Sequence, residues 1–255
     1  MTTTTTRHDD RWHRDGDHVS LLRNRPAPRP VAFDAQPDPV RIDMARAAFV
    51  IVDMQNDFLS DGGWFPERGT DPAPLLEIVP RLNAVADAFR KMGAPVIHLN
   101  WGVRADVANL PANVLDKATG CGARPGYGDE IGTGPVLVEG SWGAASHPLI
   151  TRGPGDMAIS KHRLSGFRDN ELDQVLRRYG IETLFYAGVN LDRCVFATLM
   201  DGCFQGYDAV LVQDATTTVS PAEVGEAILY IIRLLYGFTT NSADLLRALD
   251  TPDKE

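Results

Sequence analysis

Three residues with reactive side chains follow predicted strands, and their types suit a covalent hydrolysis. Asp53 ends the apolar run that begins at Ala47, Lys161 follows a short strand, and Cys194 comes a few residues after the strand ending at Val189. In an open parallel sheet, ligands bind beyond the carboxyl ends of the strands, so side chains distant in sequence can meet there. A thiolate attacks a carbonyl, a carboxylate moves protons, and an ammonium stabilises negative charge.

The position of each residue adds to this hypothesis. Cys194 is expected at the first residue of a helix, where unpaired N–H groups and the helix dipole lower the pKa of a thiol. A neighbouring Lys161 would lower the pKa of the thiol further. Asp53 could then accept the thiol proton and return it to a leaving amine. Backbone N–H groups in the turn 189–194 could bind the oxyanion that forms.

Each of these residues also has an ordinary structural interpretation. A cysteine on an amphipathic helix is usually a small buried apolar residue, and Cys203 is assigned to packing for this reason. An aspartate after a strand often caps a turn, and a lysine there is often a surface charge. Cys121 lies in a Gly-rich stretch and receives no role. The occurrence of all three types at strand ends favours catalysis, but spacing alone leaves the structural alternative open.

The segments that must position these side chains alternate between strand and helix patterns. Strands are predicted at 47–53, 95–100, 157–160, 183–189 and 209–212. Helices are predicted at 75–92, 169–179, 194–204, 221–235 and 242–249. Such alternation indicates βαβ units, a mostly parallel sheet and helices on both faces. The stretch 101–151 is dense in Gly and Pro and is predicted to be a long irregular loop that either is functional or contains short elements that the pattern does not resolve.

Composition narrows the possible classes of protein. The chain has 255 residues, 44% of them hydrophobic and 23% charged, with a net charge of −9. An acidic surface is a poor partner for nucleic acid, and no apolar run approaches the roughly 18 residues of a membrane span. Residues 1–30 are expected to form a flexible tail, and residues 31–255 a single domain. Three scattered cysteines without CxxC spacing fit a reducing, cytoplasmic setting.

A metal or cofactor site is not indicated by the sequence. His98, His147 and His162 have no partners at ligand spacing, and neither an HxH nor an HExxH arrangement occurs. The glycine clusters do not open a helix after a strand, so they do not form a phosphate loop. We therefore expect no metal and no cofactor.

Three segments, in the order found in one family, resemble the motifs of the isochorismatase-like cysteine hydrolases. They are 49–58 (FVIVDMQNDF), 159–167 (ISKHRLSGF) and 187–195 (AGVNLDRCV), and the resemblance extends from about Ala47 to the C-terminus. The resemblance implies a Rossmann-like, three-layer α/β/α sandwich with a mostly parallel sheet of about six strands.

The same resemblance implies roles for particular residues. It makes Asp53, Lys161 and Cys194 a catalytic triad. It also implies a cis peptide between Val189 and Asn190, which would turn the N–H of Asn190 toward the oxyanion beside the N–H of Cys194. Oligomers are common in the family, so a homodimer or homotetramer is expected.

Subgroups of the family with different activities differ in short sequence segments, and these can be compared with the present chain. Nicotinamidases carry a metal-binding Asp/His cluster after the second strand, where this chain has Asn100-Trp-Gly-Val-Arg104, so that activity is disfavoured. True isochorismatases usually lack the nucleophilic cysteine. Segments 140–142, 163–167 and 235–238 are similar to ureidoacrylate amidohydrolases, and 104–111 is similar to biuret hydrolases. N-carbamoylsarcosine amidase is a third relative of similar design.

The resulting prediction is a cysteine-dependent amidohydrolase. It would cleave a C–N bond of a small linear amide or ureido (N-carbamoyl) substrate through a thioester and release ammonia. Residues predicted from their positions to line the substrate pocket are Phe58, Asn100, Trp101, Trp142 and Phe167. Two alternatives stay open, namely an isochorismatase-type vinyl-ether hydrolase and a catalytically silent binding protein. The sequence leaves the exact substrate undefined.

Overall fold

A parallel six-stranded sheet forms the centre of the computed structural model, which describes residues 11–23 and 25–250. The strands lie in the order β12-β11-β10-β5-β6-β9, and every neighbouring pair is parallel. Their bounds are β5 (Ala47–Val52), β6 (Val96–Trp101), β9 (Met157–Lys161), β10 (Thr183–Gly188), β11 (Asp208–Thr216) and β12 (Phe238–Thr240). The first five match the predicted strands, whereas β12 was not predicted because three residues after a glycine carry too little pattern.

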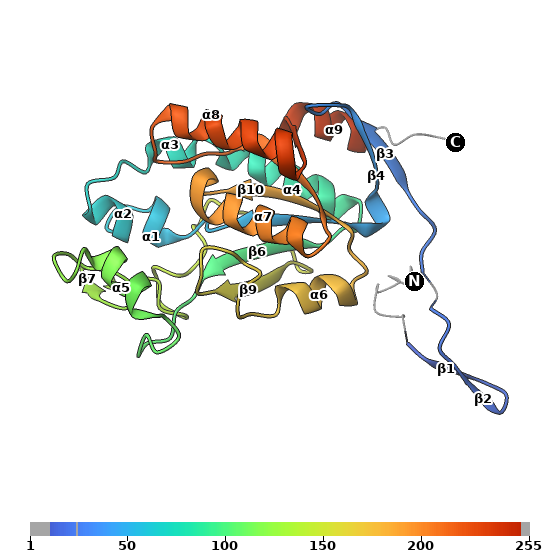
Figure 1. Ribbon diagram of the computed structural model, residues 1–255, viewed down its shortest axis with the longest axis horizontal. Helices are drawn as coiled ribbons and strands as arrows, with labels where there is room; N and C mark the ends of the chain where they lie inside the picture. Colours follow the sequence, from blue (N-terminus) through green and yellow to red (C-terminus); the bar gives the residue numbers. More distant parts are fainter. Residues whose placement is uncertain (1–10, 24, 251–255) are drawn as a thin grey trace.

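Helices cover both faces of this sheet. They are α1 (Asn56–Leu59), α2 (Trp64–Glu67), α3 (Ala73–Leu76), α4 (Val79–Lys91), α5 (Ala112–Thr119), α6 (Leu172–Arg178), α7 (Phe196–Phe204), α8 (Ala222–Ile231) and α9 (Ser242–Asp250). A 3₁₀ turn, η1 (Met44–Arg46), and two π-helical turns, η2 (Leu191–Val195) and η3 (Ile232–Tyr236), complete the set. Helices α4 and α9 pack together on one face, and α6, α7 and α8 lie over the other (Figure 1). Right-handed crossovers in both directions from β5 require this division. The predicted three-layer α/β sandwich is confirmed.

Several predicted elements differ in detail. The helix predicted at 75–92 is divided into α3 and α4, since Pro80 stands in the first turn of α4 and lacks the N–H that a continuous helix would use. The helix predicted at 221–235 changes to the π-helical turn η3 after Ile231. The loop 101–151 contains α5 and a two-stranded ribbon, β7 (Glu130–Ile131) and β8 (Gly134–Pro135).

The N-terminal segment lies apart from the sheet. Residues 1–10 and 24 of the expected tail are outside the described residues, and the described part forms an exposed hairpin of β1 (His13–Asp15) and β2 (His18–Ser20). The hairpin projects away from the body of the molecule (Figure 1). Next along the chain, β3 (Pro30–Phe33) pairs antiparallel with β4 (Val40–Asp43) beside α9. In the described part of the chain, each helix is too short or too polar to cross a membrane.

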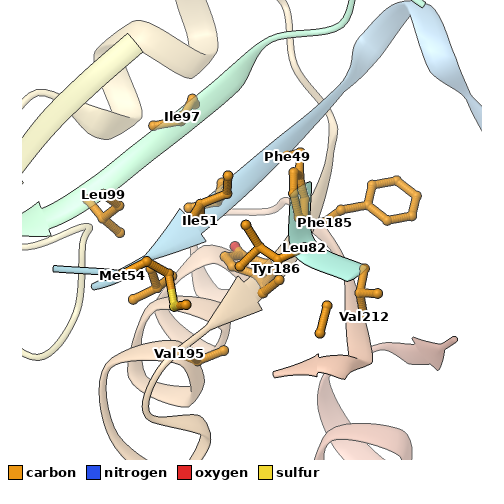
Figure 2. Packing of buried hydrophobic residues seen from close by; sticks show 14 of the residues in the cluster. Phe49, Ile51, Met54, Leu82, Ile97, Leu99, Phe185, Tyr186, Val195 and Val212 are labelled. Carbon is orange, nitrogen blue, oxygen red and sulfur yellow. The ribbon is translucent and has the colours of Figure 1, made fainter. Parts of the chain in front are cut away.

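The core is centred on β5, every residue of which is buried. Strands of a parallel sheet covered on both faces are apolar throughout, as β5 is. Phe89 of α4 packs against Phe49 and Phe185, with ring centroids 5.3 and 5.1 Å apart respectively. Figure 2 shows this packing continuing toward Met54 and Val195, beside the ends of β5 and β10. The strand ends that carry the reactive residues are therefore packed against the hydrophobic core.

Candidate active site

The structure brings together the three residues that the sequence singled out. Asp53 follows β5, Lys161 is the last residue of β9, and Cys194 lies in η2 after β10. The Lys161 Nζ is 2.9 Å from the Asp53 Oδ2. The Cys194 thiol interacts with the Asp53 carboxylate, and the three residues are 1%, 0% and 5% exposed in the order Asp53, Lys161, Cys194. A thiol, a carboxylate and an ammonium thus share one buried site at the carboxyl edge of the sheet.

The backbone at this edge takes unusual conformations. Asp53 has a φ of 52°, in the left-handed region that residues other than glycine rarely adopt outside functional sites. Its N–H donates to the Leu99 carbonyl at 2.9 Å, which fixes it to β6. Across the site, a Cβ on Gly188 would lie 2.2 Å from the Val52 carbonyl oxygen. Only glycine allows β10 to end so close to β5, and this approach places the Cys194 turn beside Asp53.

Trp101, at the end of β6, forms one wall of the site. Its indole Nε1 donates to the Cys194 Sγ at 3.3 Å, and the Lys161 Nζ lies 4.1 Å from its ring centroid. The buried Gln55 holds the Trp101 backbone, because its Oε1 accepts from the Trp101 N–H and its Nε2 donates to the Trp101 carbonyl, each at 2.8 Å. Gln55 therefore positions the indole that contacts both the thiol and the ammonium.

The Cys194 thiol is protonated in this arrangement. Helix α7 begins at Phe196, so Cys194 lies in the π-helical turn before it rather than at its first residue. Burial, with a further contribution from Asp53, raises the pKa of Cys194 to about 12, against the opposing effects of Lys161 and Trp101. The prediction of a lowered thiol pKa was wrong, because desolvation outweighs the helix terminus and the ammonium.

Burial also raises the pKa of Asp53, and the charge of Lys161 opposes this rise. A carboxylate with a raised pKa is a stronger proton acceptor than an ordinary aspartate. In the described chain, Oδ2 of Asp53 pairs with Lys161, and Oδ1 has no hydrogen bond of ordinary geometry, so Oδ1 can accept a proton. The resting site combines a protonated thiol with a basic carboxylate that the ion pair holds in place.

This protonation state predicts slow alkylation of Cys194. We expect iodoacetamide at pH 7 to label the exposed Cys121 first and Cys194 much later. Since the pKa of Cys194 is about 12, its labelling rate should rise about tenfold for each pH unit between 7 and 9. Peptide mass mapping over time measures both rates, and rapid labelling of Cys194 at pH 7 would contradict the assigned protonation state.

The turn that precedes Cys194 offers N–H groups to an anion. The peptide between Val189 and Asn190 is cis. Among the described residues, the Asn190 N–H donates no backbone hydrogen bond, while its side-chain Oδ1 accepts from the Val219 N–H at 3.1 Å. The Leu191 N–H donates to the Thr217 carbonyl at 2.9 Å, which holds the turn against the segment after β11. An unpaired N–H is thus available on a residue that lines the same cavity as the thiol.

A cavity of about 380 Å³ opens onto Cys194 and Asp53, and Lys161 lies behind Asp53 outside the lining. It is lined by Asp53, Phe58, Trp64, Phe65, Arg68, Thr70, Trp101, Arg124, Tyr127, Leu164, Asn190, Arg193, Cys194 and Val219. Two of the five predicted pocket residues, Phe58 and Trp101, are in this set. The volume suits a small molecule rather than a polymer.

The other three predicted pocket residues lie elsewhere. Asn100 faces a neighbouring cavity and donates to the Ser146 Oγ at 2.9 Å, because successive strand residues point to opposite faces and Trp101 occupies the catalytic side. Trp142 is 43% exposed, and its carbonyl, rather than its ring, contacts the Asn56 side chain. Phe167 packs on Tyr207, with ring centroids 5.6 Å apart. These three residues therefore do not line the cavity that contains Cys194, and their contact with a substrate stays a prediction.

Residues not singled out in the sequence make up most of the wall. Tyr127 stacks on Trp101 with ring centroids 4.8 Å apart, and Trp64 lies 5.3 Å from Tyr127. Asp57 fixes this wall, since its carboxylate accepts from the Trp64 N–H at 3.2 Å and from the Leu137 N–H at 2.7 Å. The sequence contained one sign of this wall, namely the polar run that continues past Asp53 to Asp57. Such a run indicates that the segment after β5 positions loops as well as a catalytic group.

No group of three or more His, Cys, Asp or Glu side chains is placed to hold a metal ion in the part of the chain that the structure describes. His98, within β6, is buried and bonds the Asp156 carboxylate at 2.9 Å. It belongs to the neighbouring cavity and not to the catalytic one.

Comparison with known proteins places this fold and site in a family. The isochorismatase domain model matches residues 47–244. The chain is 31% identical over 227 residues to ureidoacrylate amidohydrolase RutB of Caulobacter segnis, an alignment that covers 86% of this chain and 92% of the relative. The corresponding protein of Methylobacterium radiotolerans is 30% identical over 226 residues, covering 88% and 87% of the two chains. The chain belongs to the isochorismatase family of hydrolases, so the assignment from its motifs is confirmed.

Solved structures agree on the architecture. A cysteine hydrolase from Pseudomonas syringae pv. phaseolicola superposes with a TM-score of 0.70 at 22% identity, covering 83% of this chain and 96% of that one. N-carbamoylsarcosine amidase from Thermoplasma acidophilum gives a TM-score of 0.59 at 26% identity, covering 77% and 96%. The first comparison supports the fold alone. The second shows that a protein of the same fold is an N-carbamoylsarcosine amidase.

Proposed function

We propose that this protein is a cysteine-dependent amidohydrolase that cleaves the C–N bond of a small ureido (N-carbamoyl) substrate and releases ammonia. The observation that carries the proposal is the buried cluster of Cys194, Asp53 and Lys161, of which Cys194 and Asp53 line a cavity of about 380 Å³. Relatives about 30% identical over most of the chain are ureidoacrylate amidohydrolases, which supports the ureido class. A cytoplasmic setting and a homodimer or homotetramer remain predictions from the sequence.

The first half of the reaction forms a covalent bond to the enzyme. As the Cys194 Sγ attacks the substrate carbonyl carbon, its proton passes to Asp53 and the carbonyl oxygen becomes an oxyanion. The N–H groups of Asn190 and Cys194 donate to that oxygen. Asp53 then protonates the amide nitrogen, the C–N bond breaks and ammonia leaves. The acyl group remains on sulfur as a thioester, which for a ureido substrate is a thiocarbamate.

The second half removes the acyl group with water. Asp53, ionised again, accepts a proton from the attacking water, and the same two N–H groups hold the second oxyanion. The C–S bond breaks and the sulfur recovers the proton from Asp53. Lys161 keeps Asp53 in place throughout and limits the rise of its pKa, so the carboxylate is available at neutral pH. A carbamic acid product from a ureido substrate loses carbon dioxide without further help from the enzyme.

A substrate panel tests this proposal. Ureido acids, biuret and simple carboxamides are incubated with the enzyme, and ammonia release is followed by a coupled assay. We expect the ureido compounds to be hydrolysed with the highest kcat/KM. Ammonia release from none of the panel would contradict the proposal.

Two other functions lead to different results in the same assay. A vinyl-ether hydrolase would release no ammonia but would cleave an isochorismate-type enol ether and would not need Cys194. A silent binding protein would turn over none of these compounds. The complete set of thiol, carboxylate and ammonium in one buried site favours the amidohydrolase over both.

A further inference from the structure

Among the described residues, the lining of the catalytic cavity carries positive charge without a matching negative charge. Arg68 and Arg124 both line the cavity. In the described chain, neither forms an ion pair with a carboxylate within 4.0 Å, whereas Arg193, a third arginine of the lining, pairs with Asp192 at 3.5 Å. Among the described residues that line the cavity, Asp53 is the one acidic residue, and Lys161 already pairs with it.

The two guanidinium groups lie close enough to repel each other. Arg68 packs over Trp64, with its Cζ 4.9 Å from the ring centroid. The Trp64 Nε1 donates to the Pro125 carbonyl at 3.0 Å, which brings Arg124, the preceding residue, to the same end of the cavity. Burial lowers the pKa of Arg68, and the charge of Arg124 lowers it further. In a protein of net charge −9, two neighbouring arginines that have no acidic partner in the described part of the chain are placed to bind an anion.

The path from the thiol to these arginines is lined by aromatic rings. Trp101 contacts Cys194, Tyr127 stacks on Trp101, and Trp64 follows Tyr127 and supports Arg68. Flat apolar walls favour a short, planar or apolar spacer between the two ends of a ligand. The planar fork of an arginine matches a carboxylate in two parallel hydrogen bonds, which makes a carboxylate the best fit for the far end.

We propose that Arg68 and Arg124 bind a carboxylate at the end of the substrate opposite the scissile bond, so that the enzyme prefers ureido monocarboxylates to uncharged ureas. This inference rests on the proposed function for the identity of the scissile end. The arginines themselves act in binding and positioning the substrate, and they take no part in the proton transfers. Their charge selects the ligand while the aromatic rings set the distance between the carboxylate and the thiol.

The test compares two substrates of matched shape. One is 3-ureidopropionate, and the other is 3-methylbutylurea, in which an uncharged isopropyl group replaces the carboxylate. Because each charge-assisted hydrogen bond contributes substantially, we expect kcat/KM for the carboxylate to exceed that for the uncharged urea by about a hundredfold or more. In the Arg68→Gln/Arg124→Gln variant, this preference should fall by about ten- to hundredfold.

Further variants separate charge from packing. Arg68→Lys keeps the charge and should retain more of the preference than Arg68→Gln. Arg104→Gln is the matched control, because Arg104 is an exposed arginine already paired with Asp106 at 2.7 Å, and its loss should leave the preference unchanged. An unaltered preference in the double glutamine variant, or equal turnover of the two substrates by the wild-type enzyme, would overturn the inference.

A binding measurement keeps this test independent of turnover. Calorimetric titration of 3-ureidopropionate into Cys194→Ala should give a dissociation constant about ten- to hundredfold lower than titration into Cys194→Ala/Arg68→Gln/Arg124→Gln. If the wild-type enzyme released no ammonia from any ureido compound but this difference were present, the proposed function would fail and the carboxylate site would stand. Equal affinities would remove the carboxylate site whatever the enzyme's activity.

Discussion

Replacement of Cys194 by alanine is expected to reduce ammonia release by at least about ten-thousandfold, because the residues of a covalent catalytic unit act together and loss of the nucleophile removes the whole pathway. The substitution removes one sulfur atom from a site that Asp53, Trp101 and Lys161 continue to enclose. Substrate binding should therefore persist while kcat disappears. Steady-state assays of the best substrate from the panel measure both parameters.

The matched control for this substitution is Cys121→Ala. Cys121 is exposed and does not line the catalytic cavity, so its loss should leave kcat and KM unchanged. A circular dichroism melt checks that Cys194→Ala remains folded. Retention of a tenth or more of the wild-type kcat by a folded Cys194→Ala enzyme would exclude covalent catalysis by this residue.

Replacement of Lys161 by methionine is expected to affect both activity and stability. Lys161 is fully buried and pairs with Asp53 at 2.9 Å, so its loss leaves a carboxylate without a partner in an apolar site. Breaking a buried ion pair in this way typically costs about 3–5 kcal/mol. Activity should fall by about a hundredfold or more, since general acid–base catalysis depends on the protonation state of its carboxylate. Lys117→Met, on the exposed side of α5, is the control.

The pH dependence identifies the cause of the Lys161→Met effect. Lys161 opposes the rise in the Asp53 pKa that burial produces, so the variant should have a higher Asp53 pKa and an acid limb of kcat/KM displaced to higher pH. A carboxyl group with a higher pKa in the folded than in the unfolded state makes stability fall as pH rises between the two values. The stability lost in Lys161→Met should therefore be greater at pH 7 than at pH 4. An unmoved acid limb would show that Lys161 does not control Asp53.

The layers of the fold could be predicted because the strand and helix patterns carry them. The fully apolar run of β5 and the alternation of strands with helices specify a parallel sheet covered on both faces. The edge strand β12 was not predicted, because its pairing with β11 depends on tertiary contacts rather than on its own three residues. The secondary structure within the loop 101–151 was not predicted either, because α5 and the β7–β8 ribbon are short elements among glycines and prolines.

The site was predictable where residues follow strands and unpredictable where loops return to it. Asp53, Lys161 and Cys194 lie at strand ends that converge, so their meeting followed from topology. Trp64 and Tyr127 reach the cavity from α2 and from the long loop, and no local pattern relates either one to Cys194. The protonation of the thiol was also beyond the sequence, since it depends on how completely the folded chain excludes water from Cys194.

The mass of the enzyme during a single turnover tests the central claim most directly. The enzyme is mixed with the best ureido substrate, quenched in acid at increasing times and analysed as intact protein and as peptides. We expect a transient increase equal to the mass of the substrate less ammonia, located on Cys194. The Cys121→Ala control should show the same increase, because its turnover is expected to be unchanged. Complete turnover without an adduct on Cys194 at any quench time, or with an adduct on Cys121 or Cys203 instead, would contradict the account.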